Sequence, residues 1–312
     1  MRLTIVGFGN QAKSWAQNLK DSSFPVRVAL RAGSPSAHEV RSLGIELVDL
    51  ESEDFASDEA FALLIPDTDQ ASFLQTHAAR LKSGSRILYA HGFSLLENKL
   101  QDKFPNLEHI LFAPKSIGTE LRVQYLSKGK LGAVFSFEHL KTERNIVEPW
   151  LRSLSKALGI NLGPYETSFE RETHADLYSE QGLLCSLIPY TAERMFDHLV
   201  QEGTEPELAY FECWLEMKLI INAMVDKGPQ GFFDLISPNA LIGSEKGFHR
   251  LMTPEFDLKL RSLLNEIRSG EFNRELEKTD VEQTRQTIRA RWEKTPLMHT
   301  FRKIQQDAHE KN

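Results

Sequence analysis

The start of the chain constrains the fold most, because an apolar run there leads directly into a glycine-rich turn. Leu3-Thr4-Ile5-Val6 has the composition of a buried strand, and Gly7-Phe8-Gly9-Asn10-Gln11-Ala12 follows it and opens a helical stretch. In such a turn the first glycine makes the bend, the second lets backbone N–H groups approach a pyrophosphate, and the third small residue lets the helix pack on the sheet. This context predicts a dinucleotide site; the alternative is a plain glycine-rich turn in another α/β fold.

Short apolar runs recur through residues 1–163, and amphipathic stretches separate several of them. This alternation predicts a parallel, doubly wound sheet, because a helix carries the chain back between parallel strands. The expected strands are Leu3–Val6, Val26–Leu30, Glu46–Val48, Phe61–Leu64, Arg86–Tyr89, His109–Ala113 and Gly132–Phe135. The expected helices between them include Gln11–Lys20, Asp69–Leu81 and Arg144–Ala157.

After Pro164 helical periodicity dominates, and strand-like runs become scarce. The sequence therefore predicts an α/β chain, with a Rossmann-type domain over residues 1–163 and an all-α domain over 164–312. The expected helical segments of the second domain are Asp176–Ser186, Ala192–Gln201, Pro206–Val225, Glu255–Ser269 and Val281–Glu293.

The composition excludes several classes of protein. Lys and Arg number 37 and Asp and Glu 44, so the formal charge is 37 − 44 = −7, and no basic run offers a nucleic-acid surface. No stretch approaches the ~20 apolar residues of a bilayer helix, and the N-terminus lacks the pattern of a signal peptide. Cys185 and Cys213 do not form a metal-type pair and need not form a disulfide, which fits a reducing cytoplasm. We expect a cytoplasmic protein without nucleic-acid or membrane partners.

The loop after the second expected strand predicts the cofactor. Leu30-Arg31-Ala32-Gly33-Ser34-Pro35-Ser36 lacks the acidic residue that holds the ribose hydroxyl of NAD. A guanidinium with two hydroxyls, from Arg31, Ser34 and Ser36, suits a 2′-phosphate instead. The loop therefore favours NADP(H) over an exposed arginine beside serines that only turn the chain.

Two pairs of carboxylates lie in apolar helical segments of the second half. Asp176 and Glu180 are four residues apart, as are Glu212 and Glu216, so each pair shares one face of a helix. Like charges in apolar surroundings are unfavourable unless cations neutralise them, and oxygen ligands suit Mg²⁺. Convergence of the pairs would allow a site for two Mg²⁺ ions; the alternative is two solvated helix faces.

Further motifs follow in order along the chain. They are Pro66-Asp67-x-x-Gln70, His91-Gly92-Phe93, Ala113-Pro114-Lys115, Asp176-Leu177-x-x-Glu180-Gln181, Tyr210-Phe211-Glu212-x-x-x-Glu216 and Ser237-x-x-Ala240. With the glycine turn and the Arg31 loop, they make the chain resemble ketol-acid reductoisomerase of the short bacterial class, also called acetohydroxy-acid isomeroreductase. The resemblance runs from residue 3 to about 245, and more loosely through Phe272.

The resemblance implies a role for each matching residue. Asp176, Glu180, Glu212 and Glu216 match carboxylates around two Mg²⁺ ions, with one pair from each of two subunits, which implies a homodimer or a higher oligomer. Ser237 matches the serine that holds the substrate carboxylate. The residues expected to act in catalysis are Lys115, His91, Glu212 and Asp176. The expected cofactor contacts are Gly7, Phe8, Gly9, Asn10, Gln11, Arg31, Ser34, Ser36, Pro66, Asp67 and Gln70.

The family reaction that this implies has two steps. An alkyl group migrates within 2-acetolactate or 2-aceto-2-hydroxybutyrate, and NADPH then reduces the resulting 2-keto acid to a dihydroxy acid of branched-chain amino-acid biosynthesis. Three of the residues keep simpler explanations. Lys115 can also be explained as an exposed lysine at the end of a strand, and Ser237 as a helix cap before Pro238. His91 can be explained as a residue that only supports the phosphate loop.

The chain departs from the family pattern beside the expected site. Where the family has a Gly-Pro-Gly-His run, this chain has Ser116-Ile117-Gly118-Thr119. Where the family has a pair of glycines it has Ser186-Leu187, and where the family has a further glycine it has Ser179. The added volume bears on substrate choice, because one methylene changes discrimination by about 1–3 kcal/mol. Two other functions stay open: a metal-free reductase of the β-hydroxyacid dehydrogenase type, and a non-catalytic NADPH-binding sensor with a closed pocket. Glycoside hydrolysis by paired carboxylates fits poorly with the NADP-type loop.

Overall fold

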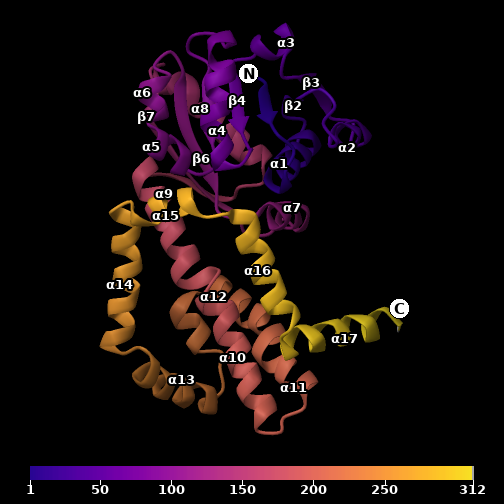
Figure 1. Cartoon of the computed structure of the whole chain (residues 1–312), viewed down its shortest axis with the longest axis vertical. Helices are drawn as coiled ribbons and strands as arrows, with labels where there is room; N and C mark the ends of the chain where they lie inside the picture. The colour runs from indigo at the N-terminus through magenta and orange to yellow at the C-terminus, as the bar shows by residue number, and fades with distance from the viewer. Residues whose placement is uncertain (311–312) are drawn as a thin grey trace. The chain divides into compact units, whose positions relative to one another are not determined.

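The computed structural model describes residues 1–310, which divide after Thr173 into two compact units (Figure 1). Helix α9 (Phe169–Ser179) begins in the first unit and continues into the second. The boundary expected after residue 163 falls within a strand, β8 (Leu162–Glu166), which belongs to the first unit.

The first unit contains one eight-stranded sheet with the order β3-β2-β1-β4-β5-β6-β7-β8. The first six strands in this order are parallel, so the predicted doubly wound Rossmann-type sheet is confirmed. The seven expected strands are present as β1 (Leu3–Val6), β2 (Val26–Leu30), β3 (Glu46–Asp49), β4 (Ala60–Leu63), β5 (Arg86–Tyr89), β6 (Glu108–Pro114) and β7 (Gly132–His139).

The edge of the sheet differs from the prediction. Strand β7 is antiparallel to β6, and β8, which the sequence did not suggest, pairs parallel to β7. An apolar run indicates a strand but not its direction, since direction depends on how the connecting segment packs. Strand β8 is largely exposed and reads Leu-Gly-Pro-Tyr-Glu, so its composition is not typical of a buried strand.

Helices cover both faces of the sheet because strand side chains alternate between them. Leu3 and Ile5 face one core with α1 (Asn10–Asp21), α7 (Gly118–Ser127) and α8 (Arg144–Ala157). Val6 faces the other core with α4 (Asp67–His77), α5 (Phe93–Asn98) and the start of α9. The shorter helices of this unit are α2 (Ala37–Ser42), α3 (Glu53–Ala56), η1 (Ala78–Arg80) and α6 (Leu100–Lys103).

The second unit is helical, as the sequence predicts, and its buried cluster includes Phe196, Tyr210 and Leu297. Many large apolar side chains are nevertheless exposed, among them Leu219, Ile220 and Val225. Throughout the described chain, every helix is too short or too polar to cross a membrane. The segments are η2 (Glu180–Leu184), α10 (Leu187–Gln201), α11 (Pro206–Tyr210), η3 (Phe211–Leu215), α12 (Glu216–Phe233), α13 (Pro238–Leu251), α14 (Pro254–Arg268), α15 (Glu271–Lys278), α16 (Val281–Glu293) and α17 (Pro296–Glu310).

Candidate active site

A cavity of about 580 Å³ lies at the carboxyl ends of β1, β2 and β4, where ligands bind in doubly wound sheets. Its lining includes seven of the eleven residues expected to contact the cofactor. These are Gly7, Phe8, Gly9, Arg31, Ser34, Ser36 and Pro66.

Two glycines shape the turn beside this cavity, Gly7 by making the bend and Gly9 by leaving the backbone open. Gly7 has a φ of +95°, and a Cβ there would lie 2.7 Å from Cγ2 of Ile65, so only glycine fits this bend. A Cβ at Gly9 would meet nothing within 4 Å, which leaves room for a bound group against the start of α1. This open helix N-terminus is suited to a pyrophosphate.

The other four expected cofactor residues lie beside the cavity rather than in its lining. Gln70 is buried, and its amide group donates to the carbonyls of Leu63 and Ile65 and to Oδ1 of Asp67, at 3.3, 3.2 and 3.1 Å. These bonds shape the loop between β4 and α4. Asn10, which begins α1 ahead of Gln11, donates to Oγ1 of Thr119 at 3.2 Å.

One wall of the cavity consists of residues for which the sequence predicts no cofactor contact. Asp69, Ser72, Phe73 and Thr76 line it from a single face of α4. Their spacing of three and four residues is the available signal, because such residues share one side of a helix. The sequence predicts only an amphipathic helix over Asp69–Leu81, with no role for its polar residues in the cofactor site.

Lys115, at the carboxyl end of β6, is paired with a carboxylate that sequence reasoning missed. Its Nζ lies 2.5 Å from Oε1 of Glu172, whose side chain is 1% exposed. The backbone N–H of Gly92 donates to the other oxygen of Glu172 at 3.0 Å. The lysine side chain itself is 39% exposed, so it remains accessible from solvent.

Helix α9 reaches this position because Gly92 has no side chain. A Cβ at Gly92 would lie 2.5 Å from Oγ1 of Thr173 and 2.9 Å from the carbonyl oxygen of Phe169. Contacts this close to backbone would force the helix away from the loop after β5. Gly92 therefore permits both the approach of α9 and the hydrogen bond to Glu172.

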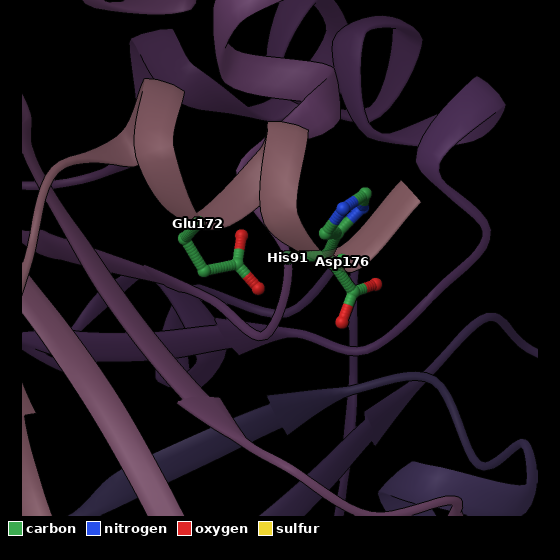
Figure 2. Close-up of side chains that lie close together, drawn as sticks. All are labelled: His91, Glu172 and Asp176. Atoms are coloured by element: carbon green, nitrogen blue, oxygen red, sulfur yellow. The ribbon is translucent and has the colours of Figure 1, made fainter. Parts of the chain in front are cut away.

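His91 lies beside the same helix, at the end of β5. Its Nδ1 is 3.5 Å from Oδ2 of Asp67, and the ligand atoms of His91, Glu172 and Asp176 all lie within 4.8 Å of one another. Figure 2 shows these three side chains, the two carboxylates coming from successive turns of α9. The continuous helix places Asp176 one turn after Glu172.

The remaining predicted metal ligands lie outside this group. Glu180 begins the turn η2, Glu212 lies in η3, and Glu216 begins α12; all three are exposed. Within residues 1–310, neither Glu212 nor Glu216 makes an ion pair. Burial, followed by the charges of Glu180 and Asp176, raises the pKa of the Cys185 thiol.

Ser237 is observed as a helix cap, because its hydroxyl accepts the N–H of Ala240 at 3.2 Å at the start of α13. Among the departures from the family pattern, Ile117 is 70% exposed at the start of α7. Gly118 packs against the glycine turn, since a Cβ there would lie 2.5 Å from the carbonyl carbon of Asn10.

Comparisons with known proteins agree with this arrangement. Residues 1–161 match the family profile of the acetohydroxy acid isomeroreductase NADPH-binding domain, and residues 169–310 that of the ketol-acid reductoisomerase C-terminal domain. The structure is similar to that of an NADH-preferring ketol-acid reductoisomerase from an uncultured archean. The identity is 26% and the TM-score 0.84, over 98% of this chain and 94% of that one.

Two less similar structures share the fold. A semialdehyde dehydrogenase NAD-binding protein from Cupriavidus necator is 17% identical with a TM-score of 0.63, over 86% of this chain and 98% of that one. A pyrroline carboxylate reductase from Plasmodium falciparum is 14% identical with a TM-score of 0.56, over 85% of this chain and 94% of that one. Because both family profiles together span nearly all of the sequence, the chain belongs to the ketol-acid reductoisomerase family and is an NAD(P)-dependent oxidoreductase.

Proposed function

We propose that the protein is an NADPH- and Mg²⁺-dependent isomeroreductase. It converts 2-acetolactate or 2-aceto-2-hydroxybutyrate to 2,3-dihydroxy acids, by alkyl migration followed by hydride reduction, in branched-chain amino-acid biosynthesis. The observation that carries the proposal is the group formed by Lys115, Glu172, His91 and Asp176 at the carboxyl edge of a sheet that also holds a dinucleotide cavity.

The donor chemistry of these residues fits Mg²⁺. Asp176 and Glu172 offer oxygen atoms close together, and Glu212 and Glu216 offer two more carboxylates without an ion-pair partner in the described chain. We assign Asp176, Glu180, Glu212 and Glu216 as the residues that hold two Mg²⁺ ions. Bound Mg²⁺ supplies Lewis acidity toward the substrate's hydroxyl and carbonyl oxygens.

The chain's own residues then act on charge and protons. Lys115 donates to the oxygen that becomes an alkoxide, and Glu172 holds the ammonium in one position through its buried carboxylate. A carboxylate, Asp176 or Glu212, accepts the proton of the substrate hydroxyl. His91 lies between Asp67 and the carboxylates of α9 and helps to position them. Ser237 binds the substrate carboxylate.

NADPH is the proposed hydride donor. Arg31, Ser34 and Ser36 line the cavity beyond the end of β2, where a guanidinium and two hydroxyls suit a 2′-phosphate. The similar archaeal enzyme is described as NADH-preferring. The preference of this chain therefore depends on its own loop residues rather than on the family.

A homodimer completes the proposed site. Helix α12 begins at Glu216, and its exposed apolar side chains include Leu219, Ile220, Ile221, Met224 and Val225. An apolar face of this extent is typical of a surface that another subunit covers. Such an interface would bring Glu212 and Glu216 of one subunit toward Asp176 and Glu180 of the other.

The test is to mix the purified protein with 2-acetolactate, Mg²⁺ and NADPH and to follow NADPH absorbance. We expect oxidation that requires both substrate and Mg²⁺. Equal activity after complete chelation would instead favour a metal-free reductase. Tight NADPH binding without turnover would favour a non-catalytic NADPH-binding sensor, provided that the protein is folded and that Mg²⁺ does not change its stability.

A further inference from the structure

Each carboxylate pair of the second unit has a member in a π-helical turn, Glu180 in η2 and Glu212 in η3. In η2 the N–H of Cys185 donates to the carbonyl of Glu180 at 2.9 Å, five residues earlier. In η3 the N–H of Glu216 donates to the carbonyl of Phe211, again five residues earlier. Each wide turn thus includes the backbone of a proposed metal ligand. Turns of this kind are rare, and they occur frequently at functional sites.

A π turn is locally unfavourable because it interrupts the backbone hydrogen bonds of the α-helix. The extra residue breaks the regular i→i−4 ladder, so a carbonyl in or next to the turn loses its usual N–H partner. In η2 the carbonyl of Gln181 instead accepts a hydrogen bond from the hydroxyl of Ser186. Gly182 lies within the turn, where a Cβ would make only ordinary contacts, the nearest being Leu260 Cδ2 at 3.6 Å.

The direction of the Ser186 hydroxyl is informative. Ser186 stands at the N-cap of α10, where a serine normally accepts an N–H of the helix that it starts. It makes no such bond here, and its hydroxyl turns back to η2. The side chain therefore stabilises the turn before it rather than the helix after it.

Resting on the proposed function, we propose that Ser186 is a positioning residue for the Mg²⁺ site. By bonding the carbonyl of Gln181 it keeps η2 in its wide form, which sets the direction of the Glu180 carboxylate relative to Asp176. A residue without a hydroxyl at this position would leave that carbonyl to water. The serine therefore gives this chain a more rigid metal site on α9 and η2.

The experiment compares metal and cofactor binding in the full-length protein. Mn²⁺ serves as the probe, by electron paramagnetic resonance and calorimetry, and NADPH binding is measured on the same samples. We expect Ser186→Ala to weaken Mn²⁺ binding about three- to tenfold, the effect of one hydrogen bond, with NADPH affinity unchanged. Ser186→Thr keeps a hydroxyl and should restore Mn²⁺ affinity.

Ser244→Ala is the matched control. The Ser244 hydroxyl donates to the carbonyl of Leu241 at 2.8 Å within the regular helix α13, so its loss should leave Mn²⁺ affinity unchanged. Deleting Gly182 shortens η2 by one residue, and we expect Mn²⁺ binding to fall further while NADPH still binds.

The outcomes separate the two proposals. Wild-type Mn²⁺ affinity in Ser186→Ala, or an equal loss of NADPH affinity, overturns the positioning role and leaves the proposed function standing. Failure of Ser186→Thr to restore affinity also overturns it. A wild-type protein that binds NADPH but no Mn²⁺ overturns both proposals.

Discussion

Oε1 of Glu172 lies 2.5 Å from Nζ of Lys115, although the two residues come from different elements, 57 positions apart in the chain. The carboxylate is buried and also accepts the N–H of Gly92, so it cannot move without losing two hydrogen bonds. This pair fixes the lysine charge at the end of β6.

Glu172→Gln should lower kcat by about 10- to 100-fold, the usual effect of removing a residue that orients an active-site group. The glutamine keeps the shape but not the charge that holds Lys115, so NADPH affinity and the melting temperature should change little. Steady-state kinetics and NADPH titration check this. Glu170→Gln, an exposed residue in the first turn of α9, is the control and should keep full activity. Wild-type kcat in Glu172→Gln would contradict the role.

Gly92→Ala should displace α9 from the loop after β5, because the new Cβ would lie 2.5 Å from Thr173 Oγ1 and 2.9 Å from a backbone oxygen. Overpacking of this kind costs about 1–3 kcal/mol, which thermal or urea unfolding measures. Activity should fall with the loss of the Glu172 contact. Gly247→Ala is the comparison, since a Cβ there meets nothing within 4 Å in helix α13, and it should be neutral or slightly stabilising. Equal stability of the two variants would exclude the close approach.

Arg31→Ala should raise the KM for NADPH about tenfold or more and leave the KM for NADH nearly unchanged. The guanidinium lines the cavity with Ser34 and Ser36, and a charge-assisted bond to phosphate is lost only with NADPH. Arg41→Ala changes an exposed arginine in α2 and should alter neither constant. A parallel rise in both KM values after Arg31→Ala would mean that Arg31 contacts a group common to the two cofactors.

His109→Asn should reduce the decrease in the free energy of unfolding that occurs between about pH 6.5 and pH 4. Burial lowers the pKa of His109 from 6.5 to about 4, so the unfolded chain binds a proton more readily than the folded one. Stability from this group is complete above pH 6.5, is lost as the pH falls toward 4, and amounts to about 3 kcal/mol.

Asparagine can still pair with the Tyr89 hydroxyl, which lies 2.9 Å from Nδ1 of His109, but it does not titrate. Burial also lowers the pKa values of His77 and His139, so part of the slope should remain. Unfolding free energies across this pH range provide the measurement, and His38→Asn, at an exposed position, should leave the slope intact. A slope unchanged by His109→Asn would place the titrating group elsewhere.

Local patterns predicted the elements that depend on local interactions. The turn from Gly7 to Ala12 predicted a helix N-terminus at the end of β1, because backbone geometry there depends on residues that are adjacent in the chain. The direction of β7 and the existence of β8 escaped prediction, since both depend on packing against β6 rather than on their own residues.

The candidate site shows the same division. The sequence by itself determined the Rossmann-type half, the helical half and seven of the seventeen residues that line the cavity, because hydrophobic periodicity and glycine requirements are local. Only the tertiary structure identified Glu172 as the partner of Lys115 and Gly92 as the residue that admits α9. The same holds for Ser186, whose hydroxyl turns back to η2 instead of capping α10. The physical reason is that a side chain's role here depends on what packs against it, and residues far apart in the chain provide the contacts to Lys115 and Gly92.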